Sequence, residues 1–78
     1  MPTVSYIKTK FGIPETKSFN VKTYALVKKN LKSYMDDCDL CNPEISVYRT
    51  RRGCWGEWFE HWCLDRNKKP HIFKQGWM

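Results

Sequence analysis

Large side chains occupy both faces of one stretch of the sequence, residues 57–64. Read at a period of two, one face of this stretch carries Trp58, Glu60, Trp62 and Leu64. The other face carries Phe59, His61 and Cys63. A segment that is apolar or aromatic on both sides is typical of a strand inside a sheet. The pattern therefore predicts an interior strand with the core on one face and a second contact surface on the other.

Two alternating segments near the N-terminus predict a β-hairpin. Residues 3–10 mix strand formers with Ser, Thr and Lys, which is typical of a strand at or near the edge of a sheet. A Gly and a Pro within residues 11–15 mark a turn. In residues 17–22, Phe19 and Val21 alternate with polar side chains. This returning strand is expected to bury one face and expose the other.

A helix is predicted from its N-cap, Thr23, to about Asp37, with Asn20 as the competing cap. Its apolar stripe comprises Tyr24, Val27, Leu31, Tyr34 and Met35. Its outer side carries Lys22, Lys28, Lys29 and Lys32. Asp36, Asp37 and Asp39 lie where the helix macrodipole is negative, which is unfavourable. A nearby cation, metal or arginine would lower that cost.

Residues 44–52 and 71–77, which flank the stretch 57–66, place their side chains alternately on two faces and are predicted to be strands. Turns are predicted at residues 53–56 and 67–70. The sequence therefore predicts an α+β fold: an N-terminal β-hairpin, one α-helix and a three-stranded antiparallel meander packed on the helix. All 78 residues are expected to form a single small basic domain.

Pairing Ile45 with Leu64 places Arg49 opposite Glu60, as an ion pair at the margin of the core. The face that packs on the helix, called the helix face, then comprises Ile45, Val47, Trp58, Trp62, Leu64 and Ile72. The second face comprises Tyr48, Phe59, His61, Cys63, His71, Phe73 and Trp77. Trp62 is expected to be among the most buried residues.

Two interpretations of the second face are open. It is either a small second core, covered by the hairpin residues Ile7, Phe11 and Phe19, or an exposed platform on which nucleic-acid bases stack. A sheet that is backed by a helix and displays aromatic side chains is similar in architecture to RNA-recognition sheets. The basic-Gly-aromatic-Gly-aromatic motif of those sheets is absent here, so the sequence indicates no family.

The net charge of +6 is unevenly distributed along the chain. Residues 1–35 hold seven lysines and one acid, Glu15, whereas residues 36–78 hold seven basic and seven acidic residues. This asymmetry favours an anionic partner, with nucleic acid first, although lysines also simply solvate small domains.

The favoured function is therefore non-enzymatic binding of RNA or single-stranded nucleic acid. The basic residues expected to contact phosphates are Lys8, Lys10, Lys17, Lys22, Lys28, Lys29, Lys32, Arg51 and Arg52. The aromatic residues expected to stack on bases are Tyr48, Trp55, Phe59 and Trp77. The alternative is a protein partner: many small virus-encoded proteins inhibit or modulate a larger host protein, and Trp, Tyr and Arg are enriched at interface hot spots.

Four cysteines without a secretion signal favour reduced thiols or a metal site over disulfides. One zinc set has suitable spacing: Cys38, Cys41, Cys63 and His71. Cys54 is excluded because a strand separates it from Cys63. Since Cys63 and His71 point to the second face and the helix ends on the helix face, free thiols are favoured over zinc and no cofactor is expected.

Catalysis has little support in the sequence. Strand alternation places His61 on the face opposite Glu60, and neither a Gly-rich phosphate loop nor a nucleophile motif is present. We therefore expect neither an enzyme nor a small-molecule substrate. No apolar stretch approaches the ~20 residues of a membrane span and no signal peptide is evident, so we expect no membrane contact and a cytoplasmic location.

Overall fold

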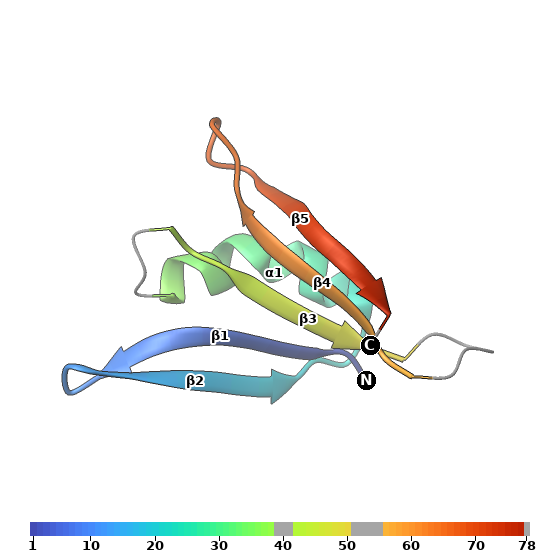
Figure 1. Ribbon diagram of the computed structural model, residues 1–78, viewed down its shortest axis with the longest axis horizontal. Helices are drawn as coiled ribbons and strands as arrows, with labels where there is room; N and C mark the ends of the chain where they lie inside the picture. Colours follow the sequence, from blue (N-terminus) through green and yellow to red (C-terminus); the bar gives the residue numbers. More distant parts are fainter. Residues whose placement is uncertain (39–41, 51–55, 78) are drawn as a thin grey trace.

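The computed structural model describes residues 1–38, 42–50 and 56–77. Within these ranges the chain forms five strands and one helix: β1 (Thr3–Lys10), β2 (Ile13–Asn20), α1 (Tyr24–Asp37), β3 (Ile45–Arg49), β4 (Trp58–Leu64) and β5 (Pro70–Trp77). The strands form an antiparallel sheet in the order β2-β1-β3-β4-β5, and α1 lies on one side of it (Figure 1). The predicted α+β class, the N-terminal hairpin and the meander of β3, β4 and β5 are confirmed.

The N-terminal hairpin extends the sheet and does not cover its second face. β1 pairs with β3 from Thr3 opposite Tyr48 to Ser5 opposite Ser46. The helix packs on both β1 and β3. The helix thus packs on the predicted meander, but the sheet that it covers has five strands and not three, because β1 joins the meander through backbone pairing. In the described part of the chain, the second face has no helix or strand over it (Figure 1).

The turn of the first hairpin is shorter than predicted. Phe11 (φ 52°) and Gly12 (φ 78°) form a two-residue turn between the paired residues Lys10 and Ile13. Two positive φ angles are typical of the type I′ turn, which suits the twist of a hairpin. Glycine adopts this conformation easily, whereas in a bulky residue such as Phe11 it costs about 1–2 kcal/mol. Pro14 belongs to β2, an edge strand, where a missing N–H is tolerated.

The predicted pairing of β3 with β4 was wrong by two residues. Ile45 lies opposite Trp62, and Arg49 lies opposite Trp58. Because side chains alternate with a period of two, this shift leaves every residue of the pair on its predicted face. Trp62 is accordingly buried, with 8% of its surface exposed, as expected.

A β-bulge in β5 changes which face its last residues occupy. The register between β4 and β5 shifts at the link between His61 and Trp62, where β5 contains the extra residue Phe73. Beyond the bulge, Trp77 lies opposite Trp58, and the centroids of the two rings are 5.1 Å apart. The prediction that Trp77 belongs to the second face was therefore wrong, since one additional residue reverses the alternation.

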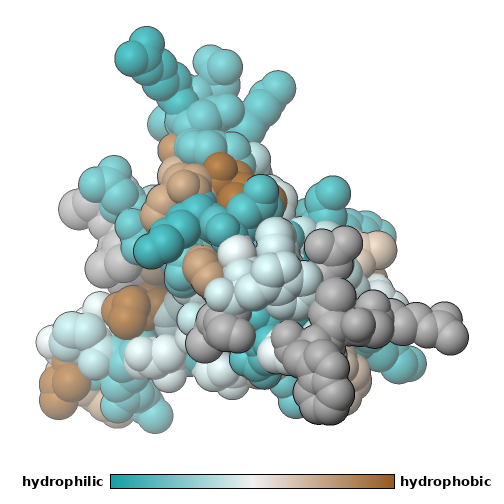
Figure 2. Space-filling view, turned by 45° about the vertical axis from the view of Figure 1, so that its right-hand side comes forward, coloured by the Kyte–Doolittle hydropathy of each residue, from teal (hydrophilic) through white to brown (hydrophobic). Residues whose placement is uncertain are grey.

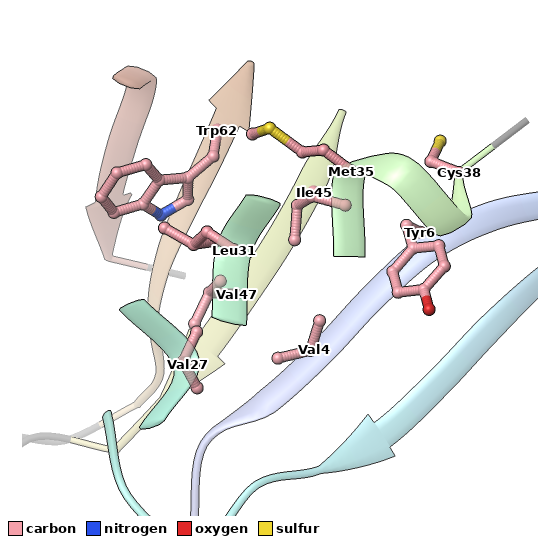
Figure 3. Packing of buried hydrophobic residues seen from close by; sticks show 9 residues of the cluster. All are labelled: Val4, Tyr6, Val27, Leu31, Met35, Cys38, Ile45, Val47 and Trp62. Carbon is pink, nitrogen blue, oxygen red and sulfur yellow. The ribbon is translucent and has the colours of Figure 1, made fainter. Parts of the chain in front are cut away.

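The core lies between α1 and the helix face of the sheet (Figure 3). It comprises Val4, Tyr6, Val27, Leu31, Met35, Cys38, Ile45, Val47 and Trp62. The helix contributes residues at a spacing of four, as the apolar stripe predicted. No helix in the described ranges is long and apolar enough to cross a bilayer.

Side chains at both ends of α1 fix its position on the sheet. Thr23 is the N-cap, and its hydroxyl accepts a hydrogen bond from the backbone N–H of Leu26. At the other end, Asp37 accepts hydrogen bonds from Lys8 Nζ (2.6 Å) and Lys17 Nζ (3.2 Å) of the hairpin. These two cations are the neighbours that the acidic helix terminus was expected to need.

Candidate nucleic-acid interface

The second face of β3, β4 and β5 carries four neighbouring rings, which we call the aromatic patch: Tyr48, Phe59, His61 and Phe73. Tyr48 lies opposite Phe59 in the β3–β4 ladder. The ring centroids of Phe59 and His61 are 5.2 Å apart, and those of His61 and Phe73 are 5.9 Å apart. Phe73 is 48% exposed, and the other three side chains are half-buried. The patch is therefore continuous across three strands and open to a ligand.

Local features of the sheet place the rings of the patch. The bulge in β5 turns Phe73 toward His61 on the second face. A Cβ atom at Gly76 would lie only 3.4 Å from Phe59 Cε1, so glycine lets the Phe59 ring lie close to the neighbouring backbone. Ser46 Oγ and His61 Nδ1 are 2.9 Å apart in a cross-strand hydrogen bond that orients the imidazole.

The cation closest to the patch in the strand register is Lys74, which lies opposite His61. By contrast, Lys8 and Lys10 follow Tyr6 in strand alternation and lie on the helix face, as does Lys17, which is paired with Tyr6. The lysines in and just before the helix are exposed on its outer side: Lys22, Lys28, Lys29 and Lys32. Most of the excess positive charge therefore lies on the side of the sheet opposite the aromatic patch.

The structure brings together only part of the predicted site. Tyr48 and Phe59 lie side by side on the second face, but Trp77 lies on the helix face with the lysines. Three further predicted residues, Arg51, Arg52 and Trp55, lie outside the described residues. Sequence reasoning placed His61 and Phe73 on the second face without including them in the site. It missed Lys74 because regular alternation, without the bulge, puts that residue on the helix face.

A buried carboxylate, Glu60, connects the start of the helix to the sheet. Glu60 is 3% exposed and accepts hydrogen bonds from Tyr24 Oη, Trp58 Nε1 (3.0 Å) and Trp62 Nε1 (3.3 Å). Arg49 Nη2 lies 3.6 Å from its Oε2, and the Arg49 guanidinium lies 3.7 Å from the centre of the Tyr24 ring. The predicted Arg49–Glu60 pair is confirmed, but Glu60 lies in the core and not at its margin. We interpret this cluster as structural, because its donors saturate the carboxylate.

Two of the hydrogen-bonded phenols make folding sensitive to alkaline pH. Burial, with the hydrogen bond to Asp37, raises the pKa of Tyr6 from 10 to about 12. Burial, with the hydrogen bond to Glu60, raises the pKa of Tyr24 from 10 to about 12. Each phenol has a higher pKa in the folded state than in the unfolded state, so its protonated form stabilises the fold. This stabilisation is fully present below pH 10 and is lost as the pH rises through about 12.

We therefore expect the urea concentration at the midpoint of unfolding to decrease as the pH rises from 10 to 12. The substitutions Tyr6→Phe and Tyr24→Phe should each reduce that fall, because the variant has one fewer phenol to ionise. Phenolate absorbance of the folded protein provides the check. Ionisation of both groups near pH 10 would contradict the prediction.

The structure separates the residues of the proposed zinc set. Cys38 is buried in the core on the helix face, whereas Cys63 and His71 face each other on the second face, with Sγ 3.5 Å from Nε2. Cys41 lies outside the described residues. Burial, together with the negative charges of Glu44 and Asp65, raises the pKa of the Cys63 thiol, so the thiolate that zinc requires is disfavoured. Among the residues that the structure describes, no three potential metal ligands converge.

No protein-family model matches this chain, and comparisons with curated proteins and with solved structures also found no match. The geometry of the second face and the distribution of charge are therefore the basis for the functional proposal.

Proposed function

We propose that the protein is a non-enzymatic binding module for RNA or other single-stranded nucleic acid. The observation that carries this proposal is the aromatic patch, which presents contiguous rings on a sheet face that α1 does not cover. Bases stack on aromatic side chains with a gain of about 1–3 kcal/mol each and with little dependence on sequence. RNA-recognition sheets stack two or three bases on a comparable set of aromatic side chains. The proposal includes a cytoplasmic location.

The separation of the patch from most lysines determines how salt should affect binding. Each phosphate contact on a single strand contributes a slope of about −0.7 to the logarithm of affinity against the logarithm of salt concentration. Seven lysine contacts would therefore give a slope of about −5. A short strand held on the patch should give a slope of about −1, because Lys74 is its principal cation. The remaining lysines would act at longer range, by attracting the polyanion.

The substitution Phe73→Ala is expected to weaken binding of a tetranucleotide such as oligouridylate by about tenfold, because it removes the most exposed ring of the patch. Fluorescence anisotropy in low and high salt measures the loss. Phe73→Ala should also leave the salt slope unchanged, since stacking is not ionic. The unfolding midpoint of the variant reports whether the fold is intact.

The matched control is Lys29→Ala, on the outer side of the helix. It should alter tetranucleotide affinity by less than about twofold, because Lys29 lies on the other side of the sheet. Weak binding that is unaffected by Phe73→Ala and that disappears in salt would contradict the proposal.

A protein partner is the second candidate function. Trp77, at the end of edge strand β5, is 45% exposed, which favours a surface for binding and modulating a larger protein. This function predicts a stoichiometric complex that survives nuclease treatment and weakens on Trp77→Ala. Dependence on Phe73 and on added RNA would instead support the nucleic-acid module.

A further inference from the structure

The tip of the first hairpin exposes an aromatic side chain in an unfavourable backbone conformation. Phe11 is 93% exposed and has a φ of 52°, a region where bulky residues are rare. Asn or Gly would form the same turn without this strain. Beside Phe11, Ile13 is also exposed. Figure 1 shows that this tip extends beyond the rest of the fold, and Figure 2 shows apolar surface at the lower left, where the hairpin ends.

A cationic groove lies next to this tip. The groove, of about 570 Å³, is lined by residues of both hairpin strands, three of them lysines: Lys8, Lys10, Lys17, Thr9, Thr16, Ser18 and Glu15. Lys8 and Lys17 bind Asp37, but Lys10 Nζ lies 5.9 Å from the centre of the Phe11 ring. The tip therefore combines an exposed ring with a neighbouring cation. Lysines are among the usual side-chain donors to phosphate oxygens.

We propose that the hairpin tip is a second nucleic-acid contact, in which a base stacks on Phe11 and the groove beside Lys10 holds the adjoining phosphate. This inference rests on the proposed function, because it assigns the tip to the same nucleic-acid strand as the aromatic patch. The exposed Phe11 ring offers a π face to the base, and Lys10 offers a cation to the phosphate. Strain at an exposed position is consistent with a binding role, since Phe11 is 93% exposed and does not belong to the core.

The distance between the two contacts sets the length of strand that can occupy both. His61, Ser46 and Ser5 are aligned in one row across the sheet. Phe11 lies six positions after Ser5, which corresponds to about 20 Å along β1 at about 3.3 Å per residue. A stacked strand advances about 3.4 Å per nucleotide. A tetranucleotide on the patch therefore stops short of the tip, whereas a dodecanucleotide reaches it.

The test compares Phe11→Asn with the unsubstituted protein on oligouridylates of four and twelve nucleotides. Asn followed by Gly12 is the preferred type I′ sequence, so the variant should unfold at a temperature roughly 4–8 °C higher. It should nevertheless bind the dodecanucleotide about tenfold more weakly and the tetranucleotide equally well. Weaker binding by a more stable variant cannot result from unfolding.

Ile13→Thr is the matched control, because it removes an exposed apolar side chain from the same tip without removing a ring. Stacking predicts less than about a twofold effect of this substitution on the dodecanucleotide. Equal dodecanucleotide affinity of Phe11→Asn and the unsubstituted protein would overturn the inference. If Phe73→Ala still weakened binding in that case, the proposed function would stand without the tip.

Anionic vesicles of phosphatidylcholine and phosphatidylserine test the competing ligand. Vesicle binding that depends on both Phe11 and Ile13, with dodecanucleotide affinity unchanged in both variants, would overturn the inference and assign the tip to a lipid surface. If both variants bind vesicles as the unsubstituted protein does, and Phe11→Asn binds the dodecanucleotide about tenfold more weakly, the inference is supported.

Discussion

Replacing Glu60 with alanine is expected to lower the free energy of unfolding by about 3–5 kcal/mol, measured by urea denaturation at neutral pH. The substitution leaves the Arg49 guanidinium beside the core without its carboxylate. It also removes the acceptor used by Tyr24 and by the indoles of Trp58 and Trp62. A domain of this size has a total stability of the order of 5–15 kcal/mol, so this loss would unfold a substantial fraction of the molecules.

The double variant Arg49→Met with Glu60→Leu separates the ionic contribution from the rest of the cluster. Apolar replacement of both partners leaves no buried charge, so we expect the double variant to be more stable than Glu60→Ala. It should remain less stable than the unsubstituted protein, because Tyr24 and the two indoles still lack an acceptor. A Glu60→Ala variant with an unchanged urea midpoint would show that the cluster does not hold the helix to the sheet.

Replacing Trp62 with alanine should also cost about 3–5 kcal/mol, because it leaves a large cavity between the helix and the sheet. Trp62 belongs to the same buried cluster as Leu31, Met35 and Ile45 (Figure 3). The expected result is a protein that is largely unfolded at 37 °C by circular dichroism.

Two controls distinguish packing from hydrogen bonding in this prediction. Trp62→Phe keeps most of the ring volume and loses the hydrogen bond to Glu60, so it should cost about 1–3 kcal/mol. Trp77→Ala removes an equally large side chain that is 45% exposed and should be better tolerated than Trp62→Ala. Equal losses for Trp62→Ala and Trp77→Ala would contradict the position of Trp62 in the core.

The geometry of the molecule favours two kinds of nucleic-acid contact with different salt dependence. The aromatic patch has one adjacent lysine in the strand register, Lys74, whereas the hairpin groove has three lysines along its walls. An oligonucleotide long enough to occupy both the patch and the groove should therefore lose affinity more steeply with salt than a short one. This difference follows from the lengths of β1 and β2, which carry the tip past the end of β3 (Figure 1).

Much of the fold could be predicted from local patterns. The helix was predicted at Tyr24–Asp37 with its cap at Thr23, because capping chemistry and a stripe at helical spacing act over a few residues. The faces of β3 and β4 were also predicted correctly, although the register was wrong by two residues. An even shift preserves the face of every side chain, so alternation alone was enough to bury Trp62, to place Glu60 on the helix face and to place Phe59 and His61 on the other side.

The tertiary structure decided the features on which the functional proposal depends. Pairing of β1 with β3 left the second face open, and no local pattern specifies which strands pair across a helix. The bulge at Phe73 moved Trp77 to the helix face and Lys74 to the second face, because one extra residue reverses the alternation beyond it. The sequence by itself thus determined which elements form and which side chains share a face within most of them. Long-range backbone pairing determined which faces are covered and where the charges lie relative to the rings, since those relations depend on contacts between residues far apart in the chain.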